Sequence, residues 1–167
     1  MTGQFSSHDF RKALGLFATG VCIVTTKYKH EQFGITINSF SSVSLDPALV
    51  LFSISHKLYS FDAFRQANGF TINVLGCHQE YLSTRFARAG ADKWKDLITE
   101  PGKHDGLIIP DVLASLDCRK YAAHDGGDHL IVVGEVTGIR TSADTDPLIY
   151  YRSNYRHLAA LKHCAVA

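Results

Sequence analysis

Hydrophobic residues near the start of the chain recur at helical spacing. Phe10, Leu14 and Phe17 lie three or four positions apart, and residues 6–9 match the S-x-x-[DE] pattern of a helix N-terminus. Gly20 follows shortly afterwards, and glycine is typical of a helix end. This pattern predicts an N-terminal helix that ends at Gly20.

Beyond Gly20 the spacing changes from helical to alternating. Ile35 and Ile37 point to one face and Thr36 and Asn38 to the other, as in a half-buried strand. The same reasoning predicts strands over residues 21–26, 34–38, 48–55, 70–75, 116–119, 130–139 and 148–152. It predicts helices over residues 61–67 and 79–89, an irregular stretch over 90–110, and a terminal helical turn that carries Tyr155, Leu158 and Leu161.

Two fold classes combine strands with helices in this way. Regular alternation of strand and helix indicates a parallel sheet, whereas short strands at hairpin spacing indicate antiparallel pairing. The chain follows the second pattern. We therefore expect a mainly β fold, a closed or nearly closed antiparallel β-barrel with added helices.

The composition fits one globular domain over residues 1–167, with its core at about 10–161. The sequence is 46% hydrophobic and 20% charged, and its formal net charge is +1. A nearly neutral chain offers no electrostatic basis for binding nucleic acid. The N-terminus lacks the apolar region of a signal peptide, and no apolar run reaches the length of a membrane span. We expect a cytoplasmic protein that does not bind a membrane.

The cysteines and histidines show no metal-ligand spacing. His124 and His129 share a predicted turn, but no cysteine or carboxylate completes a recognisable ligand set there. The cysteines are widely separated, without a C-x-x-C pair: Cys22, Cys77, Cys118 and Cys164. We therefore expect no bound metal and reduced cysteines that are mostly buried.

The stretch Gly34–Ser55 contains the candidate chemistry, because many hydroxyl groups lie between its two predicted strands. Neutral donors can satisfy the carbonyls, ring nitrogens and phosphate oxygens of a planar ligand without a buried countercharge. A solvated, serine-rich turn is the competing interpretation. The stretch has neither a Walker loop nor a G-x-G-x-x-G turn, so the residues alone leave both interpretations open.

Four separated motifs of this sequence resemble the short-chain flavin reductase family. They are FATGVCIVTT, GITINSFSSVSLDPALVLFSI, GGDHLIVVGEV and DPLIYYRSNY, in the family's order. The resemblance implies a flavin-binding split barrel of the antiparallel, Greek-key type, assembled as a homodimer. It also implies an NAD(P)H:flavin oxidoreductase that passes a hydride from NADH or NADPH to FMN or FAD. The reduced flavin would then be supplied to a partner flavin-dependent monooxygenase.

The resemblance also assigns site residues. It places the edge of the flavin ring against Thr36, Ile37, Asn38 and Ser39. It places the ribityl chain and phosphate near Ser42, Ser44, Ser53, Ser55 and Lys57. The remaining expected cofactor contacts are Arg85, Phe86 and Tyr155. Core packing for Phe86, an exposed helix charge for Arg85 and a turn-stabilising amide for Asn38 are the alternatives.

His129 closes a Gly-Gly-Asp-His turn before a predicted strand. By the resemblance it contacts the nicotinamide nucleotide and is the one catalytic residue, because it helps to position the hydride. Hydride transfer between two cofactors depends on stacking their rings and needs little acid–base help from the protein. From the residues alone, His129 is equally a strand-starting histidine bonded to its own turn.

Two other functions remain open at this stage. One is a split-barrel flavin carrier or sensor without nicotinamide turnover, and the other is a split-barrel oxidase of a small organic substrate. The Gly-Gly-Asp-His turn favours the reductase. The sequence does not decide between FMN and FAD, or between NADH and NADPH.

Overall fold

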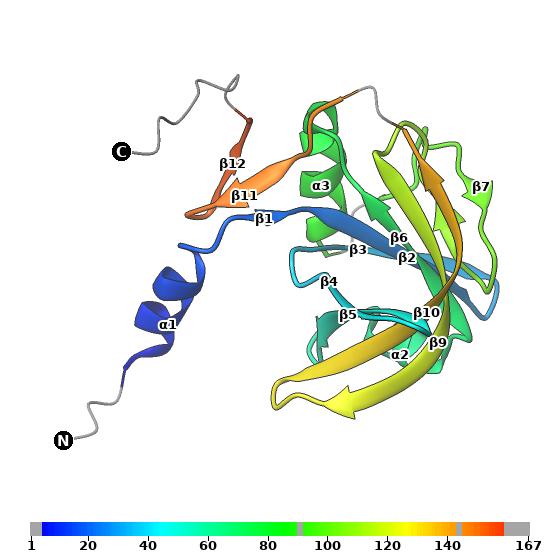
Figure 1. Ribbon diagram of the computed structural model, residues 1–167, viewed down its shortest axis with the longest axis horizontal. Coiled ribbons are helices and arrows are strands. Elements are labelled where there is room, and N and C mark those ends of the chain that lie inside the picture. Colours follow the sequence, from blue (N-terminus) through cyan, green and yellow to red (C-terminus); the bar gives the residue numbers. More distant parts are fainter. Residues whose placement is uncertain (1–4, 90–91, 143–144, 159–167) are drawn as a thin grey trace.

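The barrel is built from one antiparallel sheet (Figure 1), in a computed structural model that describes residues 5–89, 92–142 and 145–158. The strand order in this sheet is β3-β2-β6-β9-β10-β5-β4. The strands are β2 (Cys22–Tyr28), β3 (Glu31–Ile37), β4 (Ser41–Leu45), β5 (Ala48–Ser55), β6 (Gly69–Val74), β9 (Ala114–Asp125) and β10 (His129–Thr141). The mainly β, antiparallel fold predicted from the hydrophobic pattern is therefore confirmed.

Shorter elements surround this sheet. A second small sheet joins β1 (Thr19–Gly20), β11 (Ile149–Tyr151) and β12 (Asn154–Arg156), and a third joins β7 (Glu100–Pro101) and β8 (Leu107–Ile108). The helices are α1 (Ser7–Leu14), α2 (Phe61–Gln66), α3 (Glu80–Ala87) and the 3₁₀ helix η1 (Cys77–Gln79).

Strands β3 and β5 lie far apart in the strand order, yet a serine joins them. The Ser39 hydroxyl, just after β3, accepts a hydrogen bond from the Ser53 backbone N–H at 3.0 Å and lies 3.3 Å from the Ser53 carbonyl oxygen. This double contact brings the end of β3 against β5, so the sheet curls toward closure.

The sheet has a hydrophobic core on each face, and β2 contributes to both. Cys22 and Val24 belong to the core enclosed by the barrel, whereas Val21 and Ile23 belong to a second core beneath α3. Because successive side chains of a strand point to opposite faces, a strand covered on both sides is apolar throughout. This explains the continuous apolar run at the start of β2.

A buried amide holds the stretch that follows α3 against the sheet. Asn73 is fully buried in β6, and its side-chain N–H groups donate to the carbonyls of Ile23 and Leu107 at 3.2 and 3.1 Å. Its oxygen accepts from the Ile109 N–H at 3.0 Å. Residues 107–109 therefore have a fixed place, including strand β8, where the sequence predicted only irregular structure.

Helix α1 begins as predicted but ends early. Ser6 and Asp9 form a reciprocal capping box, and Gly15 caps the C-terminus, so the predicted end at Gly20 is wrong. Gly20 instead lies in β1. None of the residues of α1 is buried, and Figure 1 shows the helix set apart from the barrel.

Three other predictions differ from the structure. The serine-rich stretch after Ser39 forms strand β4, which pairs with β5, and was not predicted as a strand. The gap left between the predicted strands 21–26 and 34–38 shortens to a tight turn, because Lys29 and His30 adopt positive φ and let β2 and β3 extend. Tyr155 lies in β12 and not in a helical turn, because it pairs with Tyr150 of β11. Leu161 and Cys164 lie outside the described residues.

Candidate functional site

Two hollows lie side by side between β3 and α3. The smaller, of about 180 Å³, is lined by Asn38, Ser83 and Tyr155 among others, and the larger, of about 270 Å³, by Tyr59, Ser60 and Lys93 among others. Thr36 and Ala87 line both. The two hollows are therefore consecutive parts of one groove along β3.

The smaller hollow is neutral and polar. The Thr36 hydroxyl donates to the Ser83 carbonyl at 2.7 Å, and the hydroxyls of Ser83 and Tyr155 lie 2.7 Å apart. This chain of contacts ties β3 to α3 and to β12. The side chain of Ile37 belongs to the barrel core, so only its backbone is available to a ligand. Thr36, Ile37, Asn38 and Tyr155, four of the residues predicted from the sequence, meet in this hollow.

Asn38 differs from its neighbours because its side chain is exposed. Within the described part of the chain its amide makes no hydrogen bond, whereas Thr36 and Ser39 already use their hydroxyls within the protein. An amide offers both donors and an acceptor. Asn38 is thus available to a ligand, and the alternative of a turn-stabilising amide has no support in these contacts.

Basic and aromatic residues that the sequence did not single out line the larger hollow. Lys93 Nζ donates to the carbonyls of Gly34 and Phe86 at 3.0 and 2.9 Å. Desolvation by burial lowers the pKa of this lysine. An ammonium has three N–H groups, so one remains for an anionic ligand group. Trp94, Tyr59 and Arg88 also line this hollow. The lysine's partners are backbone carbonyls from distant elements, which leave no local sequence signal.

The predicted residues of α3 have structural contacts. Phe86 is 1% exposed and packs edge-on against Trp94, with ring centroids 5.0 Å apart, although it also lines the larger hollow. Arg85 donates to the Lys95 carbonyl at 3.0 Å and so holds the segment after α3. Phe86 is therefore packed in the core, and the Arg85 side chain is used for a contact within the protein.

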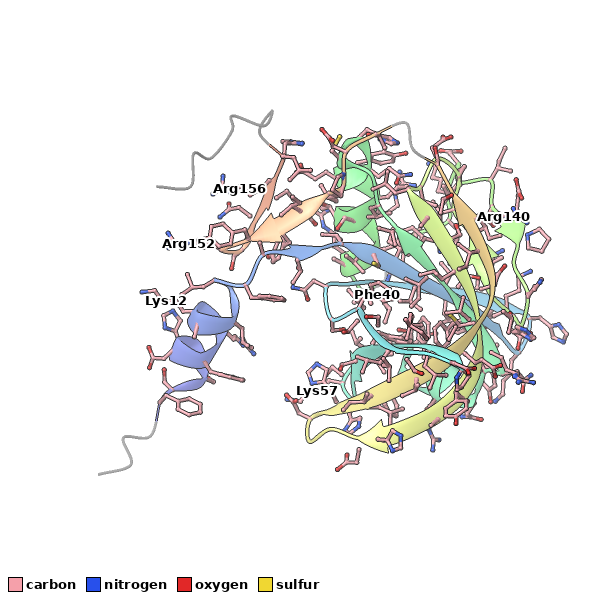
Figure 2. The ribbon with its side chains drawn as sticks, in the orientation of Figure 1. Lys12, Phe40, Lys57, Arg140, Arg152 and Arg156 are labelled. Atoms are coloured by element: carbon pink, nitrogen blue, oxygen red, sulfur yellow. The ribbon has the colours of Figure 1, made fainter. Side chains whose placement is uncertain are left out.

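None of the residues predicted at the phosphate side lines either hollow. One group lies on β4, and the other lies on β5 and just after it. Ser42 and Ser44 lie on β4 opposite Val50 and Leu49, outside both hollows. Ser55, at the end of β5, accepts a hydrogen bond from the Lys57 backbone N–H at 3.3 Å. Figure 2 shows Lys57 and Phe40 on the side of the barrel that faces α1, with Arg140 on the opposite side.

The structure brings His129 to Ser55. They are directly paired in the ladder between β10 and β5. Asp128 is the residue before His129, and its side-chain Oδ1 lies 2.6 Å from His129 Nδ1. The hydrogen bond to His129, with smaller contributions from the charges of His129 and Lys57, lowers the pKa of Asp128. Tertiary pairing thus unites two predicted sites that are 74 positions apart in the sequence.

Comparison with known proteins identifies the family of the chain. Residues 14–159 match the model of the flavin reductase like domain family. The chain belongs to this family. It is similar to the FMN reductase (NADH) SmoA of Agrobacterium fabrum, with 46% identity over 149 residues, which cover 89% of this chain and 84% of that protein.

Two other family members are informative. The reductase component of the flavin-dependent trigonelline monooxygenase of Acinetobacter baylyi is 41% identical over 148 residues, which cover 88% of this chain but only 47% of that protein. The NADH:FAD oxidoreductase SgcE6 of Streptomyces globisporus, solved in complex with NAD and FAD fragments, has a TM-score of 0.86 and 29% identity. The match covers 91% of this chain and 92% of SgcE6.

For a member of the flavin reductase family, the groove along β3 has suitable chemistry. The smaller hollow offers neutral hydroxyl and amide groups, and the larger adds a desolvated ammonium and aromatic faces. Residues 5–89, 92–142 and 145–158 contain no cluster of three or more histidine, cysteine or acidic residues that could hold a metal ion. In the same residues no helix has the length and apolar character that crossing a membrane requires.

Proposed function

We propose that this protein is an NAD(P)H:flavin oxidoreductase, acting as a single domain over residues 1–167. It transfers a hydride from NADH or NADPH to FMN or FAD and supplies the reduced flavin to a partner monooxygenase. The observation that carries this proposal is the neutral, hydroxyl-rich hollow on β3 in a chain of the flavin reductase family. The relatives named FMN reductase (NADH) and monooxygenase reductase component support it.

The groove residues suit a flavin because they offer bonds without fixed negative charge in the smaller hollow. Asn38 supplies donors and an acceptor for the polar edge of the ring, and the backbone of Ile37 lies beside it. The phosphate end would meet Lys57 or Lys93. A bound flavin supplies the hydride-accepting ring, and the protein's own contribution is to bind and orient it.

His129 is the residue that we assign to the nicotinamide. The smaller hollow already supplies the groups that a flavin edge requires, whereas His129 comes from a separate turn beside Ser55 and Lys57. Its side chain is 42% exposed, so a second ligand can reach it. In this role the imidazole orients the dinucleotide, and it does not need to exchange protons.

Steady-state oxidation of NADH and NADPH, measured with and without FMN, FAD and riboflavin, tests the proposal. We expect oxidation only when flavin is added. A folded sample that binds flavin but oxidises neither dinucleotide would instead be a carrier or sensor. A sample that needs an organic reductant would be an oxidase. Comparing the flavins and the dinucleotides in this assay also establishes which of each the enzyme prefers.

Replacing His129 tests its assignment separately. We expect His129→Ala to raise KM for the dinucleotide, to lower kcat, or both, while Kd for flavin stays nearly unchanged. His124→Ala is the matched control, because His124 belongs to the same hairpin and lies opposite Ile131 in the β9–β10 ladder. Loss of flavin affinity with normal dinucleotide kinetics at saturating flavin would show that His129 contacts the flavin and not the dinucleotide.

We propose two protein partners, a second copy of the chain and a flavin-dependent monooxygenase. Support for the homodimer comes from the apolar surface near the N-terminus, where Phe10, Leu14 and Phe17 are 51%, 57% and 77% exposed. Exposed apolar patches of this kind mark interaction sites. The monooxygenase is supported by relatives named as reductase components. We place this chemistry in the cytoplasm, where cysteines remain reduced.

A further inference from the structure

The turn between β9 and β10 holds an acid and an imidazole in direct contact. Asp128 Oδ1 and His129 Nδ1 are 2.6 Å apart, a short distance that is typical of a charge-assisted hydrogen bond. The Gly126 N–H donates to the His129 carbonyl at 2.8 Å and closes the turn. Gly127 has a φ of 82°, a conformation that glycine adopts without strain. The backbone of the turn therefore fixes the Cα positions from which the Asp128 and His129 side chains extend.

Contacts with β5 hold the same turn from the other side. The His56 N–H donates to the Asp128 carbonyl at 3.2 Å, and His129 pairs with Ser55 in the ladder. Asp128 is thus held by its backbone, while its side chain is 85% exposed. A freely rotating surface carboxylate would spend little time on one partner, but this one extends from a backbone bonded on both sides of the turn.

The bond determines which ring nitrogen faces outward. An ionised carboxylate is only an acceptor, so the hydrogen in this contact is carried by His129 Nδ1. In the neutral ring Nε2 is then the bare nitrogen, an acceptor directed away from Asp128. The amide group of a nicotinamide is a hydrogen-bond donor and is matched to such a nitrogen.

We propose that Asp128 is a positioning residue, which holds the His129 ring in place and presents Nε2 as an acceptor to the carboxamide of the nicotinamide. This inference rests on the proposed function, because it takes the dinucleotide as the ligand of His129. The charged and titratable groups around the pair are Lys57 and His56 from the β5–α2 connection and Asp125 from β9.

The state of the ring is directly measurable. In ¹⁵N-labelled protein at about pH 8.5, where imidazoles are ordinarily neutral, the wild-type His129 spectrum should show Nδ1 protonated and Nε2 bare. In Asp128→Ala the spectrum should move toward a mixture of the two tautomers. His129→Ala identifies the signal. A wild-type ring with Nε2 protonated, or an Asp128→Ala spectrum identical to wild type, would overturn the proposal.

Steady-state kinetics test whether the position of the His129 ring affects the reaction with the dinucleotide. We expect Asp128→Ala to lower kcat/KM for the dinucleotide by about two- to tenfold, the effect of losing one hydrogen bond, with unchanged Kd for flavin. Asp128→Asn retains an oxygen acceptor and should lose less. Asp125→Ala removes a neighbouring carboxylate of the same hairpin and is the matched control, with expected wild-type values. Equal kcat/KM in wild type and Asp128→Ala would contradict the proposal.

The two measurements also separate this inference from the function on which it rests. If the wild-type protein oxidises no dinucleotide in the presence of flavin, the proposed function is wrong, and the role of Asp128 toward a nicotinamide is wrong with it. If the wild-type protein is active but Asp128→Ala changes neither the spectrum nor kcat/KM, only the role of Asp128 is wrong. Thermal unfolding of each variant checks that the hairpin has not been lost.

Discussion

Hydroxyl and amide side chains near the end of β3 have different uses, although they look alike in the sequence. Thr36 donates to α3, and Ser39 joins β3 to β5, so both have structural contacts. Asn38 lies between them with an exposed side chain at the edge of the smaller hollow. Its amide is therefore the polar group of this stretch whose removal should affect a ligand more than the fold.

Replacing Asn38 by alanine tests that distinction. We expect Asn38→Ala to weaken flavin binding by a factor of about 5 to 150, since an unsatisfied partner costs about 1–3 kcal/mol. The free energy of unfolding without ligand should change little. Asn68→Ala is the matched control, because the Asn68 amide contacts Asp105 at 3.3 Å and lines neither hollow. Equal flavin Kd for Asn38→Ala and wild type, by fluorescence titration, would rule out the contact.

At the scale of elements, the groove depends on how closely α3 approaches β3. A Cβ atom added at Gly34 would overlap the buried Phe86 ring, at a separation well below van der Waals contact, so only glycine permits the observed packing. Lys93 and Trp94 then hold the following segment to the same strand by bonds to the carbonyls of Gly34 and Gln32. One small residue thus sets the spacing of both groove walls.

A methyl group at Gly34 should therefore destabilise the fold. We expect Gly34→Ala to lower the free energy of unfolding by about 1–3 kcal/mol, the usual effect of overpacking a filled core. Gly20→Ala is the control, because a Cβ there meets no atom within 4 Å. That variant should stay within about 0.5 kcal/mol of wild type. Denaturant unfolding gives both values, and equal stabilities of the two variants would show that Phe86 moves aside freely.

At the scale of the whole molecule, the N-terminal segment is unusual because it packs on little of its own chain. The Arg152 N–H donates to the Gly15 carbonyl at 2.8 Å and attaches the segment to the β11–β12 turn. Figure 2 shows Lys12 on this helix and Arg152 and Arg156 on the hairpin beside it. Among the described residues, none covers the apolar side chains of α1, and a partner molecule would bury them. In the proposed dimer, a second copy of the chain would provide the same surface in return, as two-fold symmetry requires.

Charged substitutions on the apolar face of α1 test the dimer. We expect Phe10→Asp combined with Leu14→Asp to convert a dimer into a monomer in light scattering after size-exclusion chromatography. The circular dichroism spectrum should be retained, because no residue of α1 is buried within the chain. His8→Asp adds a charge on the other face of the helix and should remain dimeric. A dimeric double variant would place the interface elsewhere.

The core enclosed by the barrel should protect its two cysteines, Cys22 and Cys118, until the whole molecule unfolds. Desolvation raises the pKa of both Cys22 and Cys118 to about 12, so these thiols stay neutral and unreactive near neutral pH. Because the pKa of each thiol in the folded protein is higher than its ordinary value of 9.0, this contribution favours folding below pH 9.0 and is lost as the pH rises toward about 12.

Alkylation followed by mass spectrometry measures this protection. We expect iodoacetamide at about pH 8 to modify partly buried Cys77 in the native protein, whereas Cys22 and Cys118 react only in denaturant. Cys77 serves as the internal control for reagent activity. Modification of Cys22 or Cys118 at the rate of Cys77 in native protein would mean that the barrel core opens locally.

The sequence by itself determined most of the strands and helices, because alternation and helical spacing record which side chains face the core. Ile35 and Ile37 pointed inward, Ser6 and Asp9 began a helix, and the motif around Asn38 indicated the flavin family. These features depend on residues within a few positions of one another. Local periodicity and capping chemistry are sufficient to predict the strand faces and the helix start, and the family follows from the resemblance of the motif.

Only the tertiary structure decided which of these residues meet. The pairing of His129 with Ser55, the Ser39 contact with Ser53 and the Lys93 bonds to β3 join positions that are distant in the sequence. Strand β4 was missed because its serines alternate with few apolar residues, and its ladder with β5 supplies the missing bonds. Long-range register and backbone acceptors carry no local pattern, so the groove and the place of His129 beside Ser55 became visible only when the chain was folded.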